Sequence, residues 1–342
     1  MSETLSDVTE LVGHRYRADD HYEVGREKIR EYARAVQDFH PVHWSEDAAR
    51  ELGYTGLVTP TTFLSTAAML ANRKLFETVV VGYDVFVQTD QVFELYKPVC
   101  TGDRLISDVE ISAARRIAGK DQLTVTNTFV DLTGDVVQIM HTTIIGVTAE
   151  EADGGIGGAI DGVIMNGVDS PSPGSAAGLF PTAPLVDSSP HLSGESRNRV
   201  PRTTIRFADI AAGMELPART ARITRGDLVN YAGVAGDVNP IHWHNGVAAL
   251  AGLPDVIAHG MLTMGLGAGF VTAWAGDPGA LLRYGVRLSN YTIVESDTAG
   301  EVEFSGRIKS VDPETGTAVV IIIAKSAGRK IFGLATAEIR LG

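Results

Sequence analysis

The chain has 342 residues, a formal net charge of −13 and a single cysteine, Cys100. This length is ample for two hydrophobic cores, and the acidic charge opposes binding to nucleic-acid phosphates. A single cysteine excludes an intramolecular disulfide framework and a cysteine-rich metal site, so we interpret Cys100 as a buried apolar residue.

No apolar run reaches the roughly 18 residues that a membrane-spanning helix needs. Glu3, Asp7 and Glu10 lie where a signal peptide would carry positive charge. We therefore expect a cytoplasmic protein without a membrane span.

The first half opens with an amphipathic helix expected at residues 26–36, followed by a polar loop and a more apolar helix at 61–76. Residues 148–200 differ in character, because they hold nine glycines and five prolines and no sustained periodicity. A structureless connection of this length predicts a flexible linker between one domain at 1–147 and another at 201–342.

The second half repeats this order. A helix is expected at 225–235, where Thr224 and Asp227 form a T-x-x-D start, and an apolar helix follows at 260–275. Strand-like segments come after it at 281–296, 300–310, 317–325 and 329–341. This pattern predicts an α+β fold in which an antiparallel sheet wraps a helix. Two such units could pair their sheets edge to edge and so hide the exposed edges.

An internal repeat relates the two halves. An offset of 199 residues aligns Tyr32-Ala33 with Tyr231-Ala232 without a gap. The same offset matches four residue types in the following loop: Asp38 with Asp237, Pro41 with Pro240, His43 with His242, and Trp44 with Trp243. An ungapped match over a helix and its loop indicates two related units.

The loop after the second-half helix carries the clearest chemistry. Asp237 and His242 lie five residues apart on a segment that contains Asn239-Pro240, so both can point into one cavity as an acid and a base. Asn239 can fix the loop through hydrogen bonds to backbone. Taken alone, the pattern fits a turn with a capping aspartate and a packed histidine better.

A second helix start strengthens the chemical interpretation. The helix is expected to begin at His259-Gly260, where free N–H groups and the absence of a Cβ at Gly260 suit a ligand oxyanion. We assign His259 only a helix-start role. Gly265, Gly267 and Gly269 follow, and they indicate close packing, either against another helix or along a ligand chain, with helix packing favoured.

Two strings in the second half resemble a known family. YAGVAGDVNPIHW (231–243) followed by AHGMLTMG (258–265) resembles the signature of MaoC-like, R-specific hotdog enzymes. GRIKSVDPE (306–314) resembles the catalytic B subunit of the mycolic-acid-type (3R)-hydroxyacyl-ACP dehydratase. DHYEVGREKIREYA (20–33) and DQVFELYKP (90–98) resemble its A subunit. The chain therefore resembles these two subunits fused.

The resemblance implies a double hotdog, with two antiparallel sheets that each wrap a central helix. It implies reversible syn elimination of water from a (3R)-3-hydroxyacyl thioester to a trans-2-enoyl thioester, with no metal and no redox cofactor. Asp237 and His242 would be the catalytic pair, Asn239 a supporting residue and Gly260 the oxyanion donor. The first half would bind the acyl chain.

The same resemblance implies partners. The substrate would be carried on acyl carrier protein or CoA in type II fatty-acid elongation, with the other type II enzymes as potential partners. The two halves would form an intramolecular pseudo-dimer, and a further homodimer stays open.

The first half departs from the A-type pattern, because Asp38 and His43 occupy the positions of the catalytic pair. The positions around them differ from the second half: Gln37 replaces Gly236, His40 replaces Asn239, Pro60 replaces His259 and Thr61 replaces Gly260. Asp38, His43 and Thr61 thus form a second or a vestigial site, and we expect one complete site, in the second half.

Several alternatives stay open. The closely spaced histidines in His242-Trp243-His244 and His40-Pro41-Val42-His43 could bind a metal with Asp237, although adjacent histidines alone are weak evidence. An R-specific enoyl-CoA hydratase of degradation or a polyketide-type dehydratase would use the same chemistry. A non-catalytic acyl-binding or assembly subunit is the alternative from another class. The carrier and the acyl length are not determined by the sequence.

Overall fold

The computed structural model describes residues 8–18, 20–80, 83, 85–147, 159, 160, 163, 190–192 and 199–342. The first-half strands are β1 (Arg15–Arg17), β2 (Tyr22–Glu23), β3 (Val85–Leu95), β4 (Arg104–Ile117), β5 (Lys120–Asp131) and β6 (Val136–Val147). The second-half strands are β7 (Glu215–Ile223), β8 (Leu281–Leu288), β9 (Gly300–Asp312), β10 (Thr317–Ser326), β11 (Arg329–Lys330) and β12 (Phe332–Arg340).

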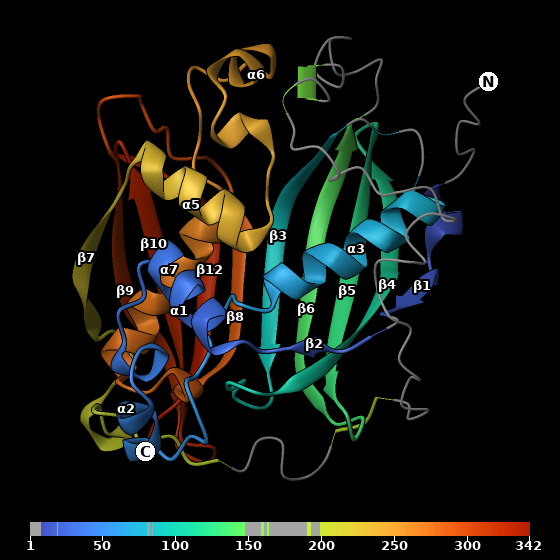
Figure 1. Cartoon of the computed structure of the whole chain (residues 1–342). Coiled ribbons are helices and arrows are strands. Elements are labelled where there is room, and N and C mark those ends of the chain that lie inside the picture. Colours follow the sequence, from blue (N-terminus) through green and yellow to red (C-terminus); the bar gives the residue numbers. More distant parts are fainter. Residues whose placement is uncertain are drawn as a thin grey trace.

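These strands form one antiparallel sheet in the order β1-β4-β5-β6-β3-β8-β12-β10-β9-β7, with β2 beside β4 and β11 beside β10 (Figure 1). The second half repeats the first in reverse order about the β3–β8 pair. At this seam Phe93 lies opposite Tyr284, and their rings stack 6.1 Å apart. The edge-to-edge pairing of two units confirms the predicted α+β double hotdog.

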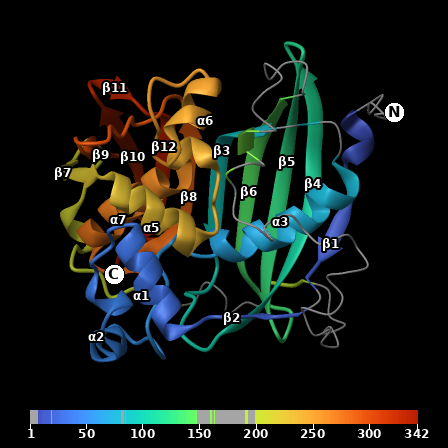
Figure 2. The same ribbon diagram turned by 45° about the horizontal axis from the view of Figure 1, so that its top comes forward.

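The helices are α1 (Arg26–Ala35), α2 (Glu46–Glu51), α3 (Ser65–Val79), α5 (Arg225–Ala235), α6 (Asn245–Leu250) and α7 (Gly260–Ala275). In Figures 1 and 2, α3 lies across β4, β5 and β6, while α1 and α5 lie over α7 and the second-half strands. The helices α5 and α7 have the predicted bounds, and α1 ends one residue early. Thr224 and Asp227 form the capping box at the start of α5.

Two predicted boundaries are wrong by more than three residues. The first-half helix begins at Ser65 rather than at residue 61, because residues 61–64 form turns. The strand predicted at 281–296 ends at Leu288, since the N–H of Ser289 donates to the carbonyl of Ile331 and the chain then leaves the sheet.

The three glycines of α7 lie against side chains of both halves. A Cβ at Gly265 would lie 2.7 Å from Val36 Cγ1, and one at Gly267 would lie 2.6 Å from Tyr284 Oη. A Cβ at Gly269 would lie 3.3 Å from Asp38 Oδ2. These distances support close packing as the reason for the glycines, although Gly267 faces its own sheet rather than another helix.

A buried carboxylate joins the two halves at the far end of α7. Asp277 is fully buried and accepts hydrogen bonds from Tyr54 Oη of the first half, from Arg199 Nη2 at 2.8 Å and from the N–H of Arg202 at 2.7 Å. Arg199 also lies 4.0 Å from the centre of the Tyr54 ring. The segment that precedes β7 is therefore held against both halves.

The predicted linker at 148–200 lies mostly outside the described residues. Of its described part, His191 accepts a hydrogen bond from the N–H of Val136 at 2.8 Å, and Arg199 belongs to the Asp277 network. The domain bounds 1–147 and 201–342 stay a prediction.

Two smaller features complete the fold. Cys100 is buried beside Val42, Tyr54 and Val58, as expected, and burial raises the pKa of its thiol. Among the described residues, no helix has the length and apolar character that crossing a membrane requires.

Candidate active site

The loop that carries Asp237 begins where α5 ends. Gly236 ends the helix in the left-handed region, with φ of 78°, and turns the chain toward the helix α7. The short 3-10 helix Pro240–His242 follows, and Asn239 Oδ1 accepts a hydrogen bond from the N–H of Ile241 at 3.2 Å. This bond agrees with the expected role of Asn239, which fixes the turn that presents His242.

His242 is buried, with 7% of its surface exposed, and its ring orientation is fixed. Its Nδ1 lies 2.8 Å from the carbonyl oxygen of Ile257, which can only accept, so Nδ1 carries the proton and Nε2 has the free lone pair. Burial lowers the pKa of His242, and the charge of Asp237 opposes this shift. The imidazole is therefore neutral near pH 7 and able to act as a base.

Asp237 faces the same space but stays apart from His242. Ligand atoms of Asp237, His242 and His259 lie within 4.8 Å of one another, yet the side chains of Asp237 and His242 form no ion pair in the described structure. Asp237 is only partly buried. Two groups at this separation can both hydrogen-bond to one oxygen atom placed between them.

Gly260 opens the helix α7 beside this pair. Its N–H donates to no group among the described residues, as expected for the first residue of a helix. A Cβ at this position would lie 2.9 Å from Leu288 Cδ1 and 3.8 Å from Gln88 Oε1 of the first-half strand β3. A side chain at residue 260 would therefore displace the end of Leu288, at the place where the predicted oxyanion donor is free.

His259 does more than start a helix, and our sequence analysis missed this. Its Nε2 donates to the main-chain carbonyl of Asp237 at 3.2 Å, and its ring stacks on that of His242 with centroids 3.8 Å apart. Burial, aided by the nearby His242, lowers the pKa of His259 to about 2. The replacement by Pro60 at the matching first-half position was the available sequence signal, because proline can supply neither contact.

The site also reaches across to the first half. The ring of Tyr231 lies 4.8 Å from that of His259, and the ring of Tyr32 lies 6.2 Å from that of Tyr231. Both tyrosines are buried, and Tyr32 Oη donates to the carbonyl of Thr62 at 2.9 Å. The two residues that revealed the repeat therefore meet at the pseudo-twofold axis and support the second-half histidines.

The alternative of a metal site is not favoured by this geometry. The rings of His242 and His259 are inclined by only 27°, and the lone pairs of imidazole nitrogens lie in the ring plane. Stacked rings therefore direct their lone pairs side by side rather than toward one ion. His244 is used elsewhere, because its Nδ1 accepts from the N–H of Val247 at 3.2 Å and caps α6.

Compared with Asp237 and His242, the first-half pair is closed. Asp38 and His43 are 5% and 0% exposed, and His43 Nε2 lies 3.3 Å from Asp38 Oδ2. Burial acts to raise the pKa of Asp38, but His43 and the N–H of His40 outweigh it and hold this pKa below its usual value. At this separation no substrate atom fits between the two side chains, and the carboxylate also packs against Gly269 of α7.

The substituted residues around this pair bind the second half instead. His40 Nε2 donates to the carbonyl of Gly276 at the end of α7, at 3.1 Å. Gln37 adopts φ of 51°, the left-handed conformation that Gly236 has at the matching position, and its Nε2 donates to the carbonyl of Arg222 at 2.7 Å. Thr61 lies in a turn before α3, so the helix start that Gly260 provides has no counterpart there. We infer that this first-half site is vestigial.

Two family models match the chain, one in each half. A model described as a FAS1-like dehydratase domain region matches residues 10–140, and a model described as a MaoC like domain matches residues 207–325. A UPF0336 protein of Mycobacterium leprae is 42% identical over 150 residues, which are 43% of this chain and 94% of that protein. A UPF0336 protein of Mycolicibacterium paratuberculosis is 41% identical over 150 residues, again 43% and 94% of the two chains.

Solved structures resemble the chain over its whole length. A MaoC-like dehydratase is 52% identical, with a TM-score of 0.89 over 98% of this chain and 100% of its own. A Mycobacterium tuberculosis protein described as a double hotdog has a TM-score of 0.62 over 96% of both chains. At 13% identity this second likeness concerns the fold alone.

Proposed function

This chain belongs to the family of MaoC-like dehydratases, and from that premise we propose that its second half dehydrates (3R)-3-hydroxyacyl thioesters reversibly to trans-2-enoyl thioesters. The observation that carries this proposal is the arrangement of Asp237 and His242 across a gap, beside the free N–H of Gly260. An acid–base pair and an oxyanion donor are the two parts that elimination next to a thioester carbonyl needs.

The proposed mechanism begins at the carbonyl. The Gly260 N–H hydrogen-bonds to the thioester oxygen and stabilises the negative charge that develops there when C2 loses its proton. The free lone pair on His242 Nε2 takes that proton, while the Asp237 carboxylate accepts a hydrogen bond from the 3-hydroxyl. The C2–H electrons become the C2–C3 double bond, and the C3–O bond breaks.

The proton then completes the water molecule. The imidazolium of His242 returns its proton to the departing hydroxyl, which Asp237 holds on the same face of the substrate. A single base can serve both transfers only when both groups leave from one face of the substrate, so the elimination is syn. In the hydration direction the same pair orients a water molecule.

The carrier and the pathway are part of the proposal. We infer acyl carrier protein or CoA thioesters as substrates and a place in type II fatty-acid elongation, with the A-like first half lining the acyl channel. The first half reaches the site through Gln88 on β3, whose amide oxygen lies 3.8 Å from a Cβ placed on Gly260. A subunit that only binds acyl chains would not need a His242 ring that is fixed through Nδ1 so that Nε2 keeps a free lone pair.

The direct test is hydration of crotonyl thioester, followed by the loss of enoyl-thioester absorbance. We expect turnover with (3R)-3-hydroxybutanoyl thioester as the product. Rates over a series of acyl lengths, on CoA and on carrier protein, identify the preferred substrate. A flat trace with short and long chains on both carriers would refute the proposed activity and favour binding alone.

A further inference from the structure

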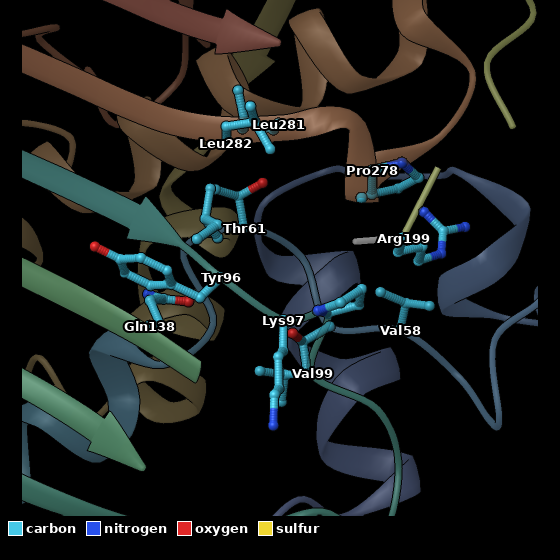
Figure 3. Close-up of a pocket in the computed structure, with 14 residues that line it drawn as sticks. Val58, Thr61, Tyr96, Lys97, Val99, Gln138, Arg199, Pro278, Leu281 and Leu282 are labelled. Carbon is cyan, nitrogen blue, oxygen red and sulfur yellow. The ribbon is translucent and has the colours of Figure 1, made fainter. Parts of the chain in front are cut away.

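A pocket lies at the seam between the halves, on the first-half side (Figure 3). Val58 and Thr61 line it, and the offset of 199 matches them to Ile257 and Gly260 of the candidate active site. The second half contributes Leu281 and Leu282 from the start of β8. The pocket is therefore the pseudosymmetric counterpart of the proposed thioester end of the active site.

The pocket has lost access to the acid–base pair. Asp38 and His43 are buried and do not line it. His43 Nδ1 donates to the carbonyl of Val58, a wall residue, at 2.6 Å, as His242 Nδ1 does to that of Ile257. A molecule held here would meet the wall residues and would be shielded from catalysis.

Two buried donors in the pocket wall have no hydrogen-bond partner among the described residues. They are Nε2 of Gln138, a side chain only 2% exposed, and Nη1 of Arg199. Figure 3 shows Gln138 beside Tyr96 on one side, Arg199 beside Pro278 on the other, and Thr61 between them. Buried donors are satisfied in nearly all folded proteins, so these two indicate a ligand that supplies acceptor atoms.

The charges around the pocket select against an anion. Lys97 Nζ already pairs with Asp131 at 3.0 Å and with Asp135, and Arg199 pairs with Asp277 at 2.8 Å. The two cations are thus compensated by three carboxylates. Much of the remaining wall is apolar, including Leu281 and Leu282. A neutral ligand with carbonyl acceptors fits this wall better than a carboxylate or phosphate does.

We propose that this pocket is a second, non-catalytic binding site for a neutral carbonyl ligand, namely the amide and thioester part of a pantetheine-type arm. The identification of the arm rests on the proposed function, because that function makes such thioesters the substrates. Gln138 donates to one carbonyl from one side, and the apolar wall covers the short chain. One molecule of the protein therefore binds two thioesters and converts one of them.

The test is binding stoichiometry of the full-length chain with S-butanoyl-N-acetylcysteamine, a neutral thioester that is saturated and cannot be hydrated. By isothermal titration calorimetry we expect the wild type to bind two equivalents of this thioester. Gln138→Leu should weaken one of them about tenfold, the loss of about one hydrogen bond, and leave crotonyl turnover unchanged. The matched control Gln122→Leu, on β5 away from the pocket, should keep both equivalents.

Two further variants distinguish the sites. Gly260→Val should remove the active-site equivalent and leave the one that is sensitive to Gln138. Leu282→Trp adds bulk to the pocket wall and keeps both donor residues, and it should remove the other equivalent; it serves as the test if Gln138→Leu does not fold. A single equivalent on the wild type that only Gly260→Val removes would overturn this proposal while the dehydratase activity stands. Butanoate that binds more tightly than the thioester and depends on Gln138 would also overturn it. Two equivalents without turnover would refute the proposed function alone.

Discussion

The rings of His242 and His259 stack 3.8 Å apart, yet their pKa values are lowered by different balances of forces. Burial acts on both rings, but the carboxylate of Asp237 favours protonation of His242, whereas His242 itself disfavours protonation of His259. One ring can therefore accept a proton during turnover while the other stays neutral and holds the backbone of Asp237.

His259 is accordingly a positioning residue, and His259→Phe should show it. Phenylalanine keeps a ring for stacking but loses the hydrogen bond to the Asp237 carbonyl, so we expect kcat to fall about fivefold to tenfold with little change in KM. Steady-state kinetics on a crotonyl thioester measures this split. His259→Gln retains an amide donor and should recover part of the loss. Equal losses in both variants would contradict the hydrogen-bonding role.

The acid–base pair should be functional in one half only. Asp237→Asn and His242→Gln should each lower kcat by about 100-fold to 10,000-fold, because they remove a group that moves or holds the reacting proton. Asp38→Asn and His43→Gln are the matched first-half changes, and turnover should stay within a few-fold of wild type. A large loss of kcat in the folded Asp38→Asn variant would show that the first half is also an active site.

The stability of the protein should decrease in acid partly because of His259. Its folded pKa of about 2 lies below the ordinary value of 6.5, so the unfolded state binds the proton more tightly. The contribution of His259 is therefore complete above pH 6.5 and falls by about 1.4 kcal/mol per pH unit below it.

Urea unfolding at pH 7, 6 and 5 measures this effect. The free energy of unfolding of His259→Phe should depend less steeply on pH than that of wild type. The difference in slope should correspond to about one proton fewer taken up on unfolding. Parallel curves for the two proteins would show that His259 does not titrate in this way.

The glycines of α7 should resist substitution. Gly267→Ala places a Cβ 2.6 Å from Tyr284 Oη, and Gly265→Ala places one 2.7 Å from Val36 Cγ1, so each should destabilise the fold by about 1–3 kcal/mol. Gly233→Ala on α5 is the control, because no atom lies within 4 Å of its Cβ position. It should stabilise the helix by about 0.5–1 kcal/mol. Thermal unfolding compares the three variants, and stabilisation by Gly267→Ala would contradict the packing account.

Local patterns predicted the helices well where the signals were local. The Thr224 capping box marked the start of α5, and the apolar composition after Gly260 marked α7. The start of α3 was misplaced because Tyr32, thirty residues away, takes the Thr62 carbonyl as an acceptor in the turn before the helix. Tertiary contacts of this kind leave no periodic trace in the sequence.

Only part of the site was predicted, again because tertiary contacts leave no periodic trace in the sequence. Asp237 and His242 share a loop, and the repeat drew attention to them, but their functional roles remain predictions. The contact of His259 with that loop spans 22 residues and depends on how α7 lies beside α5. The sequence could show that Asp38 and His43 match the pair, whereas the burial of both, and the contact of Asp38 with Gly269, required the packed structure.

The pairing of β3 with β8 also bears on how the protein is assembled in the cell. A free β8 edge would be a template for pairing with any other chain, but here it is occupied by a strand that the same polypeptide supplies. Tethering within one chain gives the two halves an effective concentration on the order of millimolar. Dilution therefore does not separate them, and synthesis always delivers them in equal numbers.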